Sequence, residues 1–387
     1  MRSSQPPTNR ADRQSPDLIV VGSGLVGLAC AYEAALAGAL VRVIDRPGAV
    51  GAASPVAAGM LAPAGEAWWG EEELLRFGLR AARDYEAFCD RLSADAESEV
   101  PYRRCGAIRV ALDGDEAAEL ERLRRYHEQL GAPAPRLVGS ECRQLEPGLA
   151  TIATAGLLFE DEAEIDPRAL ASCLRTAGQR LGVVFESAAV SGLIVERDRV
   201  GGVLADPGPV RSGAVLLATG AWGAAGWSGS SLALPVRPVK GEVLRLAVPA
   251  GAEPPCRRIV VTERIYLVAR HSGEVVIGAT SGERGFETTV SAGAVRELLR
   301  EAYRTIPEIG ELDFIEAAAG LRPCTPDNLP MLGRAGPEGL LVALGHYRNG
   351  VLLAPLSGRC LAALLVGRSP PAEITAFDPA RFATMVR

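Results

Sequence analysis

The sequence of 387 residues has few of the features that mark specialised classes of protein. Its apolar runs fall short of the roughly 20 residues that cross a membrane as a helix. The eight cysteines form no C-x-x-C pair, which argues against a zinc site or a disulfide framework and favours reduced, cytoplasmic thiols. Three histidines, His127, His271 and His346, are too few for a histidine-rich metal site. A net charge of -6 argues against nucleic acid as a partner.

The N-terminal segment, residues 1–15, is polar and lacks the apolar stretch of a signal peptide, so we expect a disordered lead-in. Apolar residues make up 48% and charged residues 23% of the chain, which is typical of a soluble globular enzyme. At about 150 residues per domain, the length predicts two or three domains. We find no internal repeat and no low-complexity linker.

The most informative stretch lies near the N-terminus. Residues 18–21 are an apolar run typical of a buried parallel strand, and Gly22, Gly24 and Gly27 follow in G-x-G-x-x-G spacing. In a dinucleotide-binding unit the first glycine makes a tight turn, the second lets a pyrophosphate approach the backbone, and the third lets helix and strand pack closely. Residues 25–36 are long enough for the helix whose N-terminal N–H groups would face the phosphates.

The segment that follows completes a strand–helix–strand unit. Gly38 stands where a left-handed helix cap belongs, residues 40–44 predict a second strand, and Asp45 ends that strand. An acid at this distance from the glycines can accept from a ribose hydroxyl. The full order favours a dinucleotide over a purely structural βαβ unit, but it does not separate NAD from FAD.

Residues 46–63 are small, glycine-rich and without helical or strand periodicity. They are either a flexible loop or a segment whose backbone lies against a large flat ligand. Here the chain resembles the flavin amine oxidases, the family of D-amino-acid, sarcosine and glycine oxidases, and residues 54–63 are most similar to the glycine oxidases of the thiamine pathway. The resemblance extends from Asp17 to the final helix, and residues 322–333 and 345–355 are its other specific parts.

The resemblance implies an α/β (α+β) fold in which a Rossmann-like FAD-binding domain is interleaved with an antiparallel-sheet substrate domain. We expect the FAD domain to comprise residues 16–100, 151–234 and 320–387. Residues 101–150 and 235–319 would form the substrate domain.

Several further elements follow from periodicity and capping. Helices are expected at residues 71–92, after Asp113 or Asp115, at 140–147, at 168–181, after Ser291 and at 351–366. Strands are expected at residues 101–112, 183–186, 214–219, 235–248, 257–269, 274–279, 314–319 and 340–344, with a hairpin at 190–205.

Two polar features have competing interpretations. The acidic run 159–167 resembles a metal site, but Asp166 followed by Pro167 is more typical of a helix start. His127 falls on the apolar face of a predicted helix, which favours a packing role over a catalytic one.

Arg322 and Tyr266 are the leading candidates for substrate recognition. An arginine at a strand end is most often a surface or ion-pair residue, and a tyrosine in a sheet is often only a packed ring. In the resembling family both residues bind the substrate carboxylate, and the planar guanidinium suits bidentate pairing. Arg264 is expected on the same strand face as Tyr266, where glycine oxidases commonly have histidine. Ser281 stands where methionine is familiar.

Residues 345–352, G-H-Y-R-N-G-V-L, predict a turn that feeds a helix N-terminus. The positive end of a helix would stabilise negative charge on a flavin ring. Arg348 could hold the far side of the substrate, and a plain helix cap would equally explain Asn349 and Gly350. Cys324 lies only three residues before Asp327, closer than in the family members that tether FAD to cysteine, so we expect non-covalent FAD.

The hypothesis is FAD-dependent oxidative deamination of glycine, sarcosine or D-alanine, with O2 as electron acceptor, by a cytoplasmic homo-oligomer that supplies thiazole biosynthesis. The alternatives are a related dehydrogenase of proline or a 2-hydroxy acid, or a non-catalytic flavin-binding subunit. The expected substrate residues are Arg322, Tyr266 and Arg348, with Met60 in the pocket. The expected FAD contacts are Gly22, Gly24, Leu25, Val26, Gly27, Asp45, Arg46, Ala53, Ser54, Ala58, Gly59, Met60, Val190, Thr219, Gly220, His346, Tyr347, Arg348, Asn349, Gly350, Val351 and Leu352.

Overall fold

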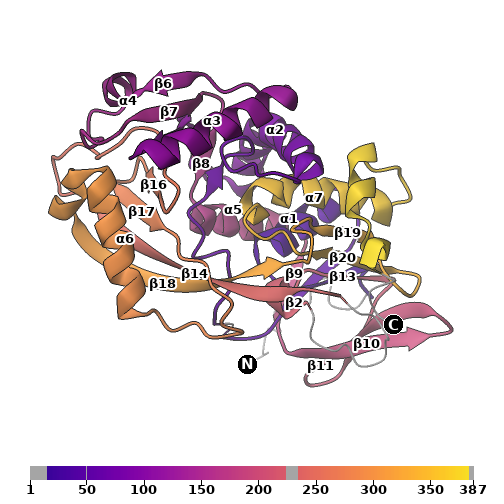
Figure 1. The fold of residues 1–387 in the computed structure, drawn as a ribbon. Helices are drawn as coiled ribbons and strands as arrows, with labels where there is room; N and C mark the ends of the chain where they lie inside the picture. Colours follow the sequence, from indigo (N-terminus) through magenta and orange to yellow (C-terminus); the bar gives the residue numbers. More distant parts are fainter. Residues whose placement is uncertain (1–14, 49, 224–233, 383–387) are drawn as a thin grey trace, which may run out of the picture.

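The computed structural model describes residues 15–48, 50–223 and 234–382 (Figure 1). The expected lead-in therefore lies outside the described residues, apart from Ser15. Two large sheets organise the described chain, one of six strands and one of eight.

The six-stranded sheet is built around the strand that precedes the glycine turn. Its order is β19-β20-β13-β1-β2-β9, and all neighbours are parallel except β19 and β20. The chain runs outward from β1 through β2 to β9, then returns to the other side of β1 as β13. A ligand crevice is expected at the carboxyl ends of the strands where this order reverses. The strands are β1 (Leu18–Val21), β2 (Val41–Asp45), β9 (Val184–Ser187), β13 (Ala214–Leu217), β19 (Met331–Arg334) and β20 (Leu340–Leu344).

A helical layer covers this sheet (Figure 1). Its central helix α1 is buried along most of its length, as its apolar composition requires. Helix α7 crosses α1 closely at Gly358. A Cβ on this glycine would lie only 2.7 Å from the carbonyl oxygen of Ala29, so a larger residue would separate the helices. The predicted bounds of the first helix are confirmed. The helices are α1 (Leu25–Leu36), α2 (Glu72–Ala96), α5 (Pro167–Arg180) and α7 (Gly350–Leu365).

The eight-stranded sheet has the order β18-β14-β17-β16-β15-β5-β7-β6. Its neighbours are antiparallel except β15 and β5. The predicted combination of a parallel and an antiparallel sheet in one mixed α/β fold is confirmed. The strands are β5 (Ala107–Ala111), β6 (Arg136–Val138), β7 (Ala155–Phe159), β14 (Arg237–Ala247), β15 (Ile259–Val261), β16 (Tyr266–Ala269), β17 (Glu274–Gly278) and β18 (Asp313–Cys324).

Three helices accompany this second sheet. Asp113 and Ser291 cap α3 and α6 with their side chains, as the sequence predicted. In Figure 1, α6 lies at the end of the molecule away from α1 and α7. The helices are α3 (Gly114–Gln129), α4 (Gly139–Leu145) and α6 (Ala292–Thr305).

Two small sheets complete the described fold. The predicted hairpin is present as β10 and β11, and β12 extends it. The strands are β10 (Val190–Glu196), β11 (Arg199–Ala205) and β12 (Pro209–Arg211), and β3 (Met60–Leu61), β8 (Ala163–Ile165) and β4 (Tyr102–Arg104).

Two of the predicted strands are wrong in extent. Residues 257–269 divide into β15 and β16 at a turn in which the Thr262 amide donates to the Ile265 carbonyl over 2.8 Å. Arg264 lies exposed in this turn, so the expectation that it shares a strand face with Tyr266 is wrong. Residues 101–112 divide into β4 and β5 near Gly106, whose φ of +72° no strand adopts.

The acidic run acts in helix initiation and ion pairing. Asp166 accepts from the amides of Arg168 and Ala169 at the start of α5, with Pro167 at the first turn. Glu164 pairs with Arg103 and Arg270 at 3.2 and 3.1 Å. The prediction of a capped helix is confirmed.

His127 is fully buried beside Phe159, away from the ligand cleft, as a packing histidine would be. Over the described residues, every helix is too short or too polar to span a membrane.

Candidate active site

A large cleft opens at the carboxyl ends of β1 and β13 and continues to the face of the eight-stranded sheet. Most of the expected site residues line it. These are Gly22, Gly24, Leu25, Val26, Asp45, Arg46, Ala53, Ser54, Ala58, Gly59, Met60, Val190, Thr219, Gly220, Tyr266, Arg322, His346, Tyr347, Arg348, Gly350 and Val351.

Three expected FAD contacts lie outside the cleft lining. Gly27 faces the preceding strand instead, because a Cβ there would lie 2.1 Å from the Gly22 carbonyl oxygen. Asn349 and Leu352 border a small neighbouring cavity.

The glycine turn brings β1, α1 and β13 into close contact. Gly22 has a φ of +106°, and a Cβ there would lie 2.4 Å from the Ala218 carbonyl oxygen. Only glycine combines this backbone conformation with this approach. The turn places the N-terminus of α1 at the mouth of the crevice.

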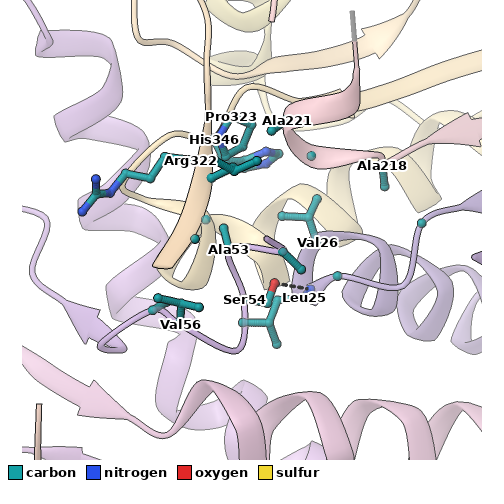
Figure 2. A pocket seen from close by; sticks show the side chains of 18 of the residues that line it. Leu25, Val26, Ala53, Ser54, Val56, Ala218, Ala221, Arg322, Pro323 and His346 are labelled. Atoms are coloured by element: carbon teal, nitrogen blue, oxygen red, sulfur yellow. Dashed lines mark hydrogen bonds between the residues drawn. The ribbon is translucent and has the colours of Figure 1, made fainter. Parts of the chain in front are cut away.

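The N-terminus of α1 presents backbone donors to the cleft. Gly24 occupies the cap position and supplies no side chain, while the Leu25 amide donates to Ser54 Oγ over 3.0 Å. Figure 2 shows this bond, with Arg322, Pro323 and His346 across the pocket. Amides and the helix dipole make such an end an anion site.

Asp45 lines the cleft at the carboxyl end of β2. Its carboxylate accepts from the amide and hydroxyl of Ser23 at 2.8 and 2.7 Å, and from the amide of Arg46 at 2.8 Å. These bonds fix the acid at the strand end that the sequence predicted. Beside it, the Arg46 guanidinium stacks 4.2 Å from the centre of the Trp222 ring.

A second helix N-terminus, that of α7, also faces the cleft. Asn349 occupies its cap position, but its side chain makes no capping hydrogen bond, and Gly350 and Val351 line the cleft. The turn before it is fixed by the Tyr347 amide, which donates to the Pro323 carbonyl over 2.9 Å. The positive end of α7 is thus directed at the cleft rather than neutralised by a side chain.

His346 lies buried beside this turn. Its Nε2 is 3.0 Å from Ser357 Oγ, and burial lowers the pKa of the ring to about 4. The imidazole is therefore neutral near pH 7 and acts as a polar but uncharged neighbour of the ligand.

Arg322 is held in place by backbone carbonyls. Its Nη1 donates to Thr280 O over 3.1 Å and to Lys240 O over 3.5 Å. The guanidinium lies across Gly241, where a Cβ would stand 2.3 Å from Nη1. A side chain at position 241 would displace the guanidinium, so the absence of a side chain at Gly241 allows Arg322 to adopt this position.

Tyr266 is placed by a matching glycine. It pairs with Gly278 across β16 and β17, and a Cβ on Gly278 would lie 2.2 Å from the tyrosine hydroxyl. Burial raises the pKa of Tyr266 to about 12, and the Arg322 guanidinium only partly opposes this. The hydroxyl therefore stays protonated and can donate a hydrogen bond throughout the neutral range.

The cleft also contains Glu66, which sequence reasoning missed. It lies in a turn after β3, and burial raises its pKa despite the guanidiniums of Arg348, Arg322 and Arg109. Nearby, Arg348 Nη2 lies 3.4 Å from Glu71 Oε2. The sequence A-G-E-A-W-W carries no motif, so only the fold reveals this carboxylate.

The lining fits an elongated, flat dinucleotide such as FAD. Small residues along 52–59 and the two uncapped helix ends provide close backbone approach and positive potential at separate points. The amides of α1 would hold the pyrophosphate, and the end of α7 would face the flavin ring. Cys324 is 1% exposed and does not line the cleft, and no cysteine is among the described residues that line it.

Comparison with known proteins agrees with this geometry. The sequence profile of the DAO family, described as FAD dependent oxidoreductase, matches residues 17–364. A glycine oxidase of Geobacillus kaustophilus is 32% identical over 95% of this chain and 96% of its own length. Its crystal structure superposes with a TM-score of 0.89 at 29% identity, covering 95% of this chain and 99% of that one.

A further relative is longer than this chain. The bifunctional protein ThiO/ThiG of Trichormus variabilis is 34% identical over 95% of this chain, which spans only 55% of that protein's length. This chain therefore corresponds to about half of that polypeptide.

Proposed function

The chain belongs to the DAO family of FAD-dependent oxidoreductases, and from this premise we propose that it oxidises glycine or a similarly small amino acid. The expected family and cofactor are thereby confirmed, and similarity to glycine oxidases supports the substrate class. The products would be the imino acid, which hydrolyses to a keto acid and ammonia, and H2O2.

The observation that carries this proposal is that Arg322 and Tyr266 line the same cleft as the N-termini of α1 and α7. Only Nη1 of Arg322 is used by backbone carbonyls among the described residues, so the other N–H groups remain for a carboxylate. The protonated Tyr266 hydroxyl adds a second donor. A carboxylate held there would fix the position of the adjoining Cα.

The bound FAD would accept hydride from that Cα and pass the electrons to O2. The chain itself would hold the substrate carboxylate, orient the adjoining Cα and polarise the substrate. Met60 and Arg348 line the cleft with Arg322 and Tyr266, and we assign them to the walls of the substrate site. Attachment of FAD is proposed to be non-covalent.

The test uses purified holoenzyme and a panel of glycine, sarcosine, D-alanine and proline. Flavin bleaching with peroxide release supports the oxidase, and bleaching without peroxide would indicate the alternative, a dehydrogenase. A flavin that no amine bleaches would leave the non-catalytic subunit as the better account.

Arg322→Ala tests the assigned carboxylate contact. Loss of a hydrogen-bonded charge should cost about 1.5–3 kcal/mol, which raises the KM for glycine about 10- to 150-fold. Arg264→Ala is the matched control, because Arg264 is exposed in the turn before β16 and does not line the cleft. Equal KM values for the two variants would remove Arg322 from the substrate site.

Two finer expectations belong to this proposal. Similarity to proteins named ThiO/ThiG supports a role in supplying thiazole biosynthesis. From the family resemblance we also propose a cytoplasmic homo-oligomer. Light scattering should then give a multiple of the monomer mass, and a monomer at all concentrations would contradict it.

A further inference from the structure

Glu66 stands apart from the other acids near the substrate end of the cleft. Glu71 pairs with Arg348 at 3.4 Å and accepts from Asn328 at 3.1 Å, and Glu162 accepts from the Gly65 amide. The Glu66 carboxylate lines the cleft and has neither a hydrogen bond nor an ion pair with the residues the structure describes. Glu66 is half-buried, and a partly desolvated carboxylate without a protein partner is suited to pairing with a cationic group of a ligand.

Charged groups from several different elements surround Glu66 and affect its pKa. Burial is the largest influence on its pKa and raises it, while three guanidiniums lower it. Glu66 in turn raises the pKa of Tyr266. The surrounding charged and titratable groups are Arg109 on β5, Arg322 on β18, Arg348 before α7, Glu71 before α2, Glu162 before β8 and Tyr266 on β16.

We propose that Glu66 accepts the proton that the substrate ammonium group must lose before its Cα–H bond can be oxidised. This assignment rests on the proposed function. The ammonium N–H bond breaks, an O–H bond forms on Glu66, and the electron pair stays on nitrogen. That lone pair then stabilises the imine as hydride leaves Cα, which an ammonium nitrogen cannot do.

The charge pattern of the cleft matches an amino-acid zwitterion. Arg322 offers donors to the carboxylate, and Glu66 offers the ammonium group the one uncommitted carboxylate among the described residues of the lining. The guanidiniums of Arg348 and Arg109 are engaged elsewhere, with Glu71 and with the Gly65 carbonyl at 3.1 Å. A carboxylate whose proton affinity is raised by burial is suited to this transfer.

A small cavity adjoins Glu66 and is the proposed route by which the proton leaves. It borders Glu66, Glu71 and Asn349, and its volume of about 10 Å³ is near the minimum that holds one water molecule. A water held there would lie between Glu66 and Glu71, and we assign it the transfer of the proton away from Glu66 between turnovers.

The experiment compares wild-type holoenzyme with Glu66→Gln in anaerobic flavin reduction by glycine across pH 6–10. Without the acceptor, the variant must take neutral amine from solution. Its reduction rate divided by Kd should then rise about tenfold per pH unit up to the pKa of the free amine. In the wild type Glu66 takes the proton from the bound ammonium group. The reduction rate divided by Kd should therefore stop rising at a pH below the pKa of the free amine. Glu160→Gln is the matched control, because Glu160 is exposed and does not line the cleft.

Ligand binding gives a readout apart from turnover. 2-Methylalanine has no Cα–H to oxidise, and isobutyrate has the same carbon skeleton with hydrogen in place of the ammonium group. From flavin absorbance, wild type should bind 2-methylalanine about 10- to 150-fold more tightly than isobutyrate, and Glu66→Gln should lose most of this preference. If Glu66→Gln fails to hold FAD, Glu66→Asp should keep the wild-type pH profile at a lower rate.

An unchanged pH profile and an unchanged preference in Glu66→Gln would overturn the assignment while leaving the oxidase intact. So would a Glu66→Asp variant whose profile follows the free amine. A wild-type flavin that no amine reduces would overturn the proposed function and this assignment with it.

Discussion

Substituting Gly241 by alanine should displace the Arg322 guanidinium from its position while residue 322 itself remains arginine. The added Cβ would lie 2.3, 2.4 and 2.5 Å from Nη1, Cζ and Nη2 of the guanidinium. Gly241 does not have a positive φ, so the backbone accepts alanine. The atoms in conflict are at the far end of a flexible side chain, so Arg322 moves and the fold does not.

The magnitude follows from the contact that is lost. A hydrogen bond to a charged group contributes about 1.5–3 kcal/mol, so the Kd of a small carboxylate such as acetate should rise about 10- to 150-fold. Acetate binding can be followed through the flavin absorbance. Gly282→Ala is the matched control, because its Cβ would meet only Arg284 Cγ at 3.9 Å. Wild-type acetate affinity in Gly241→Ala, with FAD bound, would refute the placement of Arg322.

Three further predictions concern other parts of the cleft. Tyr266→Phe removes a neutral donor, so the KM for glycine should rise about 2- to 12-fold, and an unchanged KM would exclude the hydroxyl from the substrate contact. Ser54→Ala leaves the Leu25 amide without its partner, so urea denaturation of the apoprotein should give a free energy of unfolding about 1 kcal/mol lower, whereas no change would show that the bond is dispensable. Burial raises the pKa of Glu162 to about 8, so the native state binds more protons than the unfolded state between the usual carboxyl pKa and pH 8. This group therefore lowers stability as pH rises through that window, and Glu162→Gln should lose part of the wild-type decline in Tm; an identical decline would contradict the shift.

The sequence predicted the glycine turn between β1 and α1 well because its constraints are local. Gly22 must adopt a positive φ beside β13, and α1 must follow at once, so spacing alone locates the turn. Asp45 follows from the length of one helix and one strand. The bounds of β1, α1 and β20 were predicted to the residue for the same reason.

The substrate end depends on contacts between distant segments, and there the sequence was less informative. Glu66 shows no pattern until β3 and its turn are placed beside Arg322 and Arg348. Gly241 and Gly278 resemble ordinary strand glycines until the side chains lying over them are known. The prediction for Arg264 was wrong because a turn at Thr262 and Ile265 divides a run that looks continuous in sequence.

The central claim is that the cleft holds a small amino acid with its Cα–H bond against the flavin of a bound FAD. The most direct measurement is anaerobic rapid mixing of the holoenzyme with glycine and with Cα-deuterated glycine, followed by flavin absorbance. Glycine should bleach the flavin, and deuterium at Cα should slow the bleaching. A flavin that stays oxidised with glycine, sarcosine and D-alanine alike would contradict it.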